Sequence, residues 1–154
     1  MPIVATSLSG IIAIFVFYNI SDGIQSKLSF SKEFKHCNTI TFDGRDWIAL
    51  EFDKTGIVTK RVYTTNAESL LKHLPMIPEI TAIICVRVAA RHISKWSPWW
   101  VRSCNEVARY ASGVDIGFTF NPVHLYNKLL KYNQLRNYEI LSHWRRSEHG
   151  ILRR

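Results

Sequence analysis

The chain carries a helix-start signature at Ser103-Cys104-Asn105-Glu106. Serine is a preferred helix cap, and a glutamate three residues later can reach back to the amide of the capping residue. The apolar residues that continue the helical spacing are Val107, Ala108 and Ala111. We therefore predict a helix that Ser103 caps and that begins at Cys104.

This predicted position gives Cys104 the surroundings of a nucleophile. The unpaired N–H groups and the positive end of the helix dipole favour thiolate over thiol there, and the neighbouring Arg102 and Arg109 act in the same direction. The alternative is a small buried residue that starts an ordinary helix, because free cysteine is among the most buried residue types. The helix-start signature taken alone favours this structural alternative.

A nucleophilic cysteine needs a base, and among the six histidines of the chain His36 stands out by its context. It begins a strand pattern at 36–42, which a turn-rich link containing Asp43-Gly44 joins to a second strand pattern at 47–52. An Asp-Gly pair between two such runs predicts a β-hairpin. The hairpin would bring polar side chains of the two strands next to one another.

Glu51, near the end of the second strand, is a candidate to orient the imidazole of His36 and to stabilise its charged form. Asp53 is the nearest rival for this role. The alternation along the strand, taken alone, favours a solvent-facing carboxylate for Glu51. A second open choice concerns the base, because His92 lies in the aromatic segment 91–100. That segment is either one wall of a cleft or a loop that its tryptophans anchor to the core.

Four short motifs occur in an order that is more specific than any one of them. They are Phe34-Lys35-His36, Asp46-Trp47-Ile48-Ala49-Leu50-Glu51, Pro98-Trp99-Trp100-Val101-Arg102-Ser103-Cys104-Asn105-Glu106-Val107 and Asn121-Pro122-Val123-His124-Leu125-Tyr126. This order resembles the circularly permuted papain-like proteins, the permuted branch of NlpC-type cysteine peptidases and lecithin:retinol-acyltransferase-like enzymes. The likeness is closest to small bacteriophage-encoded members and covers about residues 11–130.

The resemblance implies an α+β, single-domain fold in which an antiparallel sheet packs against a helix that begins with the nucleophilic cysteine. In such proteins a cysteine attacks an acyl carbon, a histidine is the general base and a third polar residue holds the imidazole. By resemblance these roles fall on Cys104, His36 and Glu51. We expect the papain-like domain at 1–132 and a basic C-terminal extension at 133–154.

The remaining segments alternate between strand and helix patterns. We expect strands at 56–63 and 80–90, helices at 21–28 and 66–74, a short strand or extended loop at 114–120, and a helix that starts at Asn121-Pro122. The packing stripe of that last helix is Leu125, Leu129 and Leu130. At 154 residues and 47% hydrophobic composition, the chain can form one domain with a substantial core.

The apolar run at 11–18 favours a buried strand, since it lacks a basic flank and is short for a membrane span. The stretch from Val4 to Ile20 leaves a weak membrane anchor as the alternative. We expect no signal peptide, little interaction with membranes, and a location in the host cytoplasm or the phage virion.

The three cysteines are odd in number and lack metal-ligand spacing, which argues against a disulfide scaffold and a zinc site. Cys85 lies in a continuous apolar run and is expected in the core. Cys37 should point to the opposite face of its strand from His36, so we expect a structural role for it as well. We predict neither a metal ion nor an organic cofactor.

The formal charge of +8 favours acidic partners. Residues 128–154 hold seven basic residues against two acidic ones, interleaved with Tyr132, Tyr138 and Trp144. Basic residues with aromatics can bind single-stranded nucleic acid, although a basic tail is more often a solvated or docking arm.

Two hypotheses about function follow. The first is a papain-like cysteine peptidase or amidase that acts on bacterial cell-wall peptides, or on another acyl substrate, through an acyl-enzyme at Cys104. The second is a non-catalytic phage virion protein with the same fold, whose basic C-terminal arm binds other virion proteins or DNA.

Overall fold

The computed structural model describes residues 11–20, 33–42, 44–53, 56–63, 66–89, 103–133 and 135–147. Within these residues the chain is an α+β domain, with one antiparallel sheet and three α-helices. The strands are β1 (Ile11–Tyr18), β2 (His36–Phe42), β3 (Trp47–Asp53), β4 (Gly56–Val62), β5 (Ile80–Val88) and β6 (Tyr138–Arg145). The helices are α2 (Ala67–His73), α3 (Cys104–Ser112) and α4 (Pro122–Lys131), and a short 3-10 helix, Leu74–Met76, follows α2.

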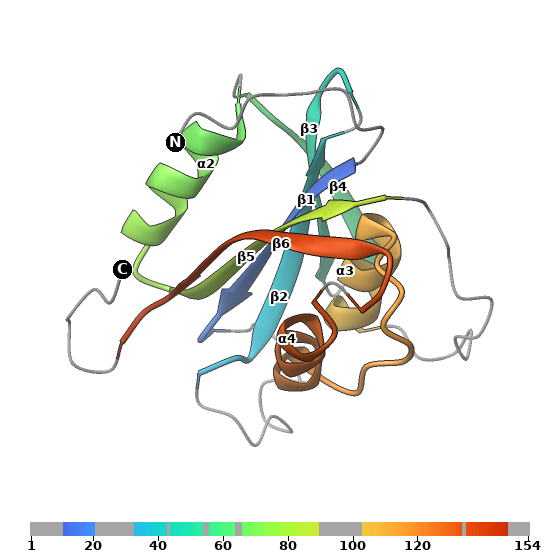
Figure 1. Cartoon of the computed structure of the whole chain (residues 1–154). Coiled ribbons are helices and arrows are strands. Elements are labelled where there is room, and N and C mark those ends of the chain that lie inside the picture. Colours follow the sequence, from blue (N-terminus) through green and yellow to red (C-terminus); the bar gives the residue numbers. More distant parts are fainter. Residues whose placement is uncertain are drawn as a thin grey trace.

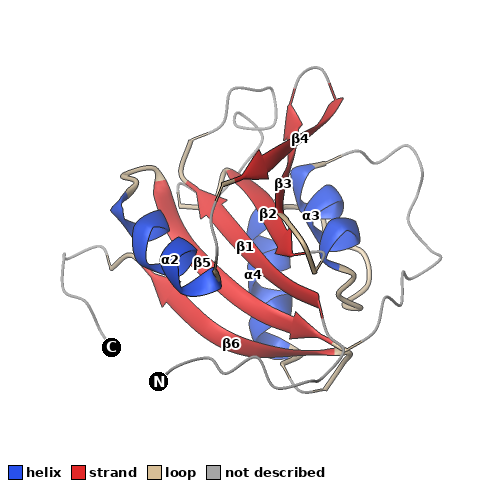
Figure 2. Cartoon of the chain, turned by 90° about the horizontal axis from the view of Figure 1, so that it is seen from above, coloured by secondary structure: helices blue, strands red, loops and turns tan. Residues whose placement is uncertain are grey.

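The sheet has the strand order β4-β3-β2-β1-β5-β6, and each strand is antiparallel to its neighbours. Helices cover both faces: α2 lies over one face, and α3 and α4 lie over the other (Figure 1, Figure 2). The core is accordingly divided into two apolar clusters, and side chains along β1 alternate between them. Phe15 and Phe17 belong to the cluster under α3 and α4, whereas Ile14 and Val16 belong to the cluster under α2.

The buried strand predicted at 11–18 is confirmed, and it is β1. It pairs with β2 on one side and with β5 on the other. The side chains from Ala13 to Phe17 are fully buried, because the sheet is covered on both faces. In the part of the chain that the structure describes, no helix is both long enough and apolar enough to cross a membrane.

β2 and β3 form the predicted hairpin. Their register places Thr39 opposite Leu50 and Ile40 opposite Ala49. Gly44, in the link between the strands, has a φ of 99°, a conformation that glycine adopts without steric cost. The hairpin therefore places the strand that begins with His36 alongside the strand that carries Glu51.

The helix starts expected at 66 and at 121–122 are confirmed. The side chain of Asn66 accepts a hydrogen bond from the Ser69 amide at 2.7 Å, and that of Asn121 accepts one from the His124 amide at 2.8 Å. Pro122 occupies the first turn of α4, where a missing N–H has no cost. The stretch 114–120 is an extended loop, and the helix expected at 21–28 lies outside the described residues.

The segment at 133–154, expected as a basic extension, contributes a strand to the sheet. β6 pairs with β5, with Tyr138 opposite Val88. Tyr138 is buried, and its hydroxyl donates a hydrogen bond to the Leu129 carbonyl at 2.7 Å. The sequence pattern did not indicate this strand, because basic residues and a bulge interrupt its apolar alternation. Residues 138–145 thus belong to the folded domain.

Candidate active site

α3 presents Cys104 at its first turn. The Ser103 hydroxyl accepts a hydrogen bond from the Glu106 amide at 3.4 Å, and the Ser103 carbonyl accepts one from the Val107 amide at 3.0 Å. The helix ends at Gly113, whose φ of 74° is the left-handed conformation of a glycine C-cap. Ser103 is thus the N-cap, and Cys104 lies where the helix dipole favours an anion.

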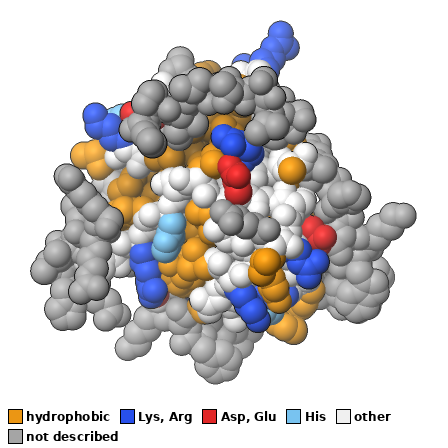
Figure 3. All heavy atoms as spheres, in the orientation of Figure 1, with side chains coloured by type: hydrophobic (Ala, Val, Ile, Leu, Met, Phe, Trp, Pro, Cys, Tyr) orange, Lys and Arg blue, Asp and Glu red, His pale blue; other side chains and the backbone are white. Residues whose placement is uncertain are grey.

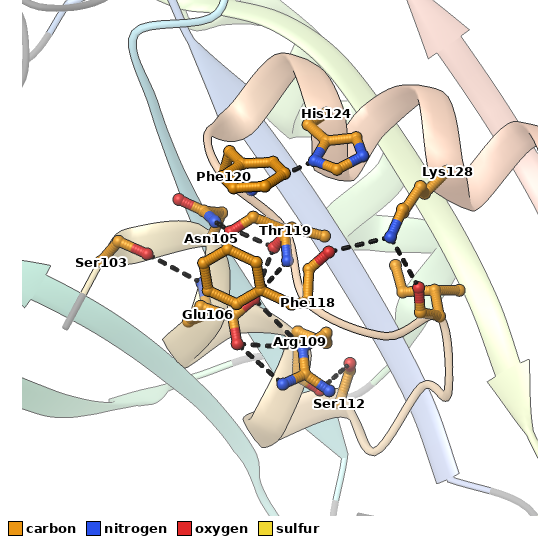
Figure 4. A network of polar contacts seen from close by, with 11 residues as sticks. Ser103, Asn105, Glu106, Arg109, Ser112, Phe118, Thr119, Phe120, His124 and Lys128 are labelled. Atoms are coloured by element: carbon orange, nitrogen blue, oxygen red, sulfur yellow. Dashed lines mark hydrogen bonds and ion pairs between the residues drawn. The ribbon is translucent and has the colours of Figure 1, made fainter. Parts of the chain in front are cut away.

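A buried polar network ties α3 to the loop that precedes α4 (Figure 4). Glu106 and Arg109 form an ion pair of 2.7 Å, with side chains that are 3% and 1% exposed. Thr119 donates to the Glu106 carboxylate from its amide at 2.8 Å and from its hydroxyl at 2.7 Å. The Asn105 side chain donates to the Thr119 carbonyl at 2.6 Å. Asn105 and Glu106, which follow Cys104 on α3, are therefore held in place by these hydrogen bonds.

This network changes the expected roles of two charged residues. The sequence predicted that Glu106 reaches back to the cap, and the structure adds Arg109 and Thr119 as its partners. Burial opposes the charge on Glu106, but hydrogen bonds from Arg109 and Thr119 outweigh it and lower the pKa of Glu106. Arg109 was expected to favour a thiolate at Cys104, yet its guanidinium charge is balanced by Glu106 within the network.

The structure brings Cys104 together with His36. Hydrogen bonds from Cys37 and from His36, together with the charge of His36, hold the pKa of Cys104 well below its ordinary range, although burial acts in the opposite direction. His36 is half-buried at the first position of β2, and Cys104 is 3% exposed. A thiolate beside an imidazole at the positive end of a helix has the chemistry of an activated nucleophile.

Cys37 is the second neighbour of Cys104. It lies on the face of β2 that packs under α3 and α4. There it is fully buried and hydrogen-bonds to Cys104, and this burial together with the Cys104 contact raises the pKa of Cys37. Cys37 therefore belongs to the surroundings of the candidate nucleophile, in addition to the structural role that the sequence suggested.

A ring contact and two hydrogen bonds connect His36 to Glu51 through Tyr18 and Asn38. Tyr18 lies directly across from His36 on β1, with ring centroids 5.8 Å apart. The Asn38 side chain donates to the Tyr18 hydroxyl at 2.9 Å and to Glu51 Oε1 at 3.3 Å. Glu51 also forms an ion pair of 3.0 Å with Lys60. Burial raises the pKa of Tyr18 to about 12, so its phenol stays neutral at physiological pH.

Asp53 ends β3 and pairs with Gly56 across the strand. His92 and the aromatic segment 91–100 lie outside the described residues. Among the residues that are described, no cluster of three or more His, Cys, Asp or Glu side chains could hold a metal ion.

Sequence reasoning missed Tyr18 and Asn38 and gave Cys37 no role at the site. The alternation of β2 places His36 and Asn38 on one face and Cys37 on the other, so the pattern contained part of the signal. The partner strand supplied the rest: the register of β1 against β2 brings Tyr18 opposite His36. That register depends on tertiary pairing, which local spacing does not encode.

Comparison with known proteins adds no assignment, since no protein-family model, curated protein or solved structure matches this chain.

Proposed function

We propose that this protein is a papain-like cysteine hydrolase, a peptidase or amidase that forms an acyl-enzyme at Cys104. The observation that carries the proposal is the hydrogen-bonded pair of Cys104 and His36 at the N-terminus of α3. The α+β architecture, with α3 packed on an antiparallel sheet, agrees with the permuted papain-like arrangement that the sequence motifs resemble.

In this mechanism the Cys104 thiolate attacks the carbonyl carbon of an amide, and the carbonyl oxygen becomes an oxyanion. The Cys104 backbone N–H, at the first position of the helix, helps to stabilise this oxyanion. The imidazolium of His36 then gives its proton to the departing amine as the C–N bond breaks. The neutral imidazole next takes a proton from water, which attacks the thioester, and the Cys104 thiolate leaves.

Glu51 is the third residue of the proposed site, and it acts as a positioning residue. Its carboxylate accepts a hydrogen bond from the Asn38 amide, Asn38 donates to the Tyr18 hydroxyl, and the Tyr18 ring lies 5.8 Å from the His36 ring. We expect Glu51→Gln to lower kcat and to shift the pH profile of kcat/KM, with little change in KM. Asp53→Asn is the matched control, and a larger effect from it would transfer the role to Asp53.

The proposed substrate is a bacterial cell-wall peptide, and the proposed source is a bacteriophage. The resemblance to small phage-encoded members supports this choice, and the formal charge of +8 would favour approach to an anionic cell wall. Free amines released from purified peptidoglycan measure the activity. We expect Cys104→Ala and His36→Ala to abolish release while folding normally, and Cys85→Ala to retain it. Equal release by Cys104→Ala and the parent chain would contradict the proposal.

The docking alternative receives less support from the described residues. Arg145 forms an ion pair of 2.7 Å with Glu33, and Arg146 donates hydrogen bonds to the Ile80, Pro75 and Ile77 carbonyls. On the face shown in Figure 3, the coloured Lys and Arg side chains are dispersed among apolar and neutral atoms. Two charges of the supposed arm thus already have partners inside the fold.

A further inference from the structure

We propose that Cys37 is a resolving thiol for Cys104, so that peroxide closes a reversible disulfide between them and blocks the nucleophile. This inference concerns regulation of the site proposed above and rests on the same thiolate. It assigns a chemical role to a cysteine that the hydrolytic mechanism does not use.

The packing of α3 on β2 sets how far each cysteine lies from the contact between the two elements. The Thr39 hydroxyl donates a hydrogen bond to the Ala108 carbonyl at 3.2 Å, which fixes one point of contact between strand and helix. Cys37 lies two residues before Thr39 on the same face, and Cys104 lies four residues before Ala108. These steps span about 7 Å along a strand and about 6 Å along a helix, so both cysteines are displaced from the contact by nearly equal distances.

The contacts of the two side chains agree with this placement. Cys37 and Cys104 belong to the same apolar cluster, and they hydrogen-bond to each other. Both are free thiols. The strand and the helix that carry the two cysteines thus pack them into one cluster as direct partners, which is what disulfide closure requires.

Disulfide formation takes two steps, and each cysteine is the attacking group in one of them. In the first step, the Cys104 thiolate attacks one oxygen of hydrogen peroxide, an S–O bond forms, the O–O bond breaks, and the departing hydroxide takes up a proton to leave as water. In the second step, the Cys37 sulfur attacks the Cys104 sulfenic acid, and the S–OH oxygen leaves as water with the Cys37 proton. The two thiols together lose two electrons and two protons, and one peroxide becomes two waters.

Cys85 provides an internal control for this chemistry. It lies in the other apolar cluster, on the α2 side of the sheet, and burial raises its pKa to about 12. Cys85 is also a buried cysteine, but among the described residues neither a thiol nor an imidazole contributes to its pKa. We therefore expect Cys85 to stay reduced at peroxide levels that oxidise the Cys37–Cys104 pair.

The test is a peroxide titration of the full chain, followed by proteolysis without reductant and peptide mass spectrometry. We expect a peptide that links Cys37 to Cys104, with the mass loss of two hydrogen atoms, and its disappearance with dithiothreitol. In Cys37→Ser, we expect Cys104 to proceed to sulfinic acid, which dithiothreitol does not reverse. Cys85→Ser should behave as the parent chain does.

Several results would overturn the inference. One is the formation of sulfinic acid at Cys104 in the parent chain while Cys37 stays unmodified. Another is oxidation of Cys85 at peroxide levels that leave both Cys37 and Cys104 reduced. Mapping in the parent chain decides the question even if Cys37→Ser does not fold. The measurement needs no turnover, so a disulfide in a chain that hydrolyses no wall peptide contradicts only the proposed function. Hydrolysis without the disulfide contradicts only this inference.

Discussion

Replacement of Glu106 by glutamine should be among the most destabilising single changes near the site. The substitution keeps the shape of the side chain and removes its charge, so the Arg109 guanidinium would remain 1% exposed without its counter-ion. The loss of one partner from a buried ion pair costs about 3–5 kcal/mol, because the other charge stays desolvated. We expect Glu106→Gln to lower the free energy of unfolding by about that amount.

Urea unfolding, followed by circular dichroism and by fluorescence of the five tryptophans, measures this change. Glu51→Gln is the matched control, since it makes the same chemical change in an ion pair whose side chains are 60% and 32% exposed. Exposed pairs contribute about 0–1 kcal/mol, so the control should lose little. Equal losses of unfolding free energy in Glu106→Gln and Glu51→Gln would contradict this reasoning. So would a double variant, Glu106→Gln with Arg109→Gln, whose loss equals the sum of the two single losses.

Three further predictions concern stability. Asn121→Ala should lower the free energy of unfolding by about 1 kcal/mol, because the side chain caps the His124 amide; His124→Ala, which keeps that amide, should not lose the cap. Thr39→Val should cost about 1 kcal/mol through loss of the bond to the Ala108 carbonyl, and an unchanged urea midpoint would contradict this contact. The pKa of Glu106 is lowered from 4.5 in the folded chain, so its ionised form contributes stability that is complete above that pH and is lost as pH falls through the folded value. The parent chain should therefore lose stability in acid more steeply than Glu106→Gln.

The parts of the fold that local patterns encode were predictable. The apolar run of β1, the Asp-Gly link of the hairpin and the asparagine caps each act within a few residues, so spacing and residue type reveal them. β6 was missed because its pattern is interrupted and its partner, β5, is distant in the sequence. A strand whose stability depends mainly on pairing with a distant strand has only a weak pattern in its own sequence.

The candidate site divides in the same way. The position of Cys104 on the first turn of α3 follows from a cap and a few apolar residues. Its contact with Cys37 and the link of Tyr18 to His36 depend on how α3 and β1 pack on β2. Such contacts join residues far apart in the chain, so spacing along the sequence could not identify them.

The most direct test of the catalytic account is the pH dependence of iodoacetamide labelling at each cysteine, read by peptide mass spectrometry. The account predicts that Cys104 reacts fast well below the unperturbed thiol pKa of about 8.5, that Cys37 and Cys85 react slowly, and that His36→Ala removes much of the difference. Labelling of Cys104 no faster than that of Cys85, or labelling unaffected by His36→Ala, would contradict the activated Cys104–His36 pair on which the proposed function depends.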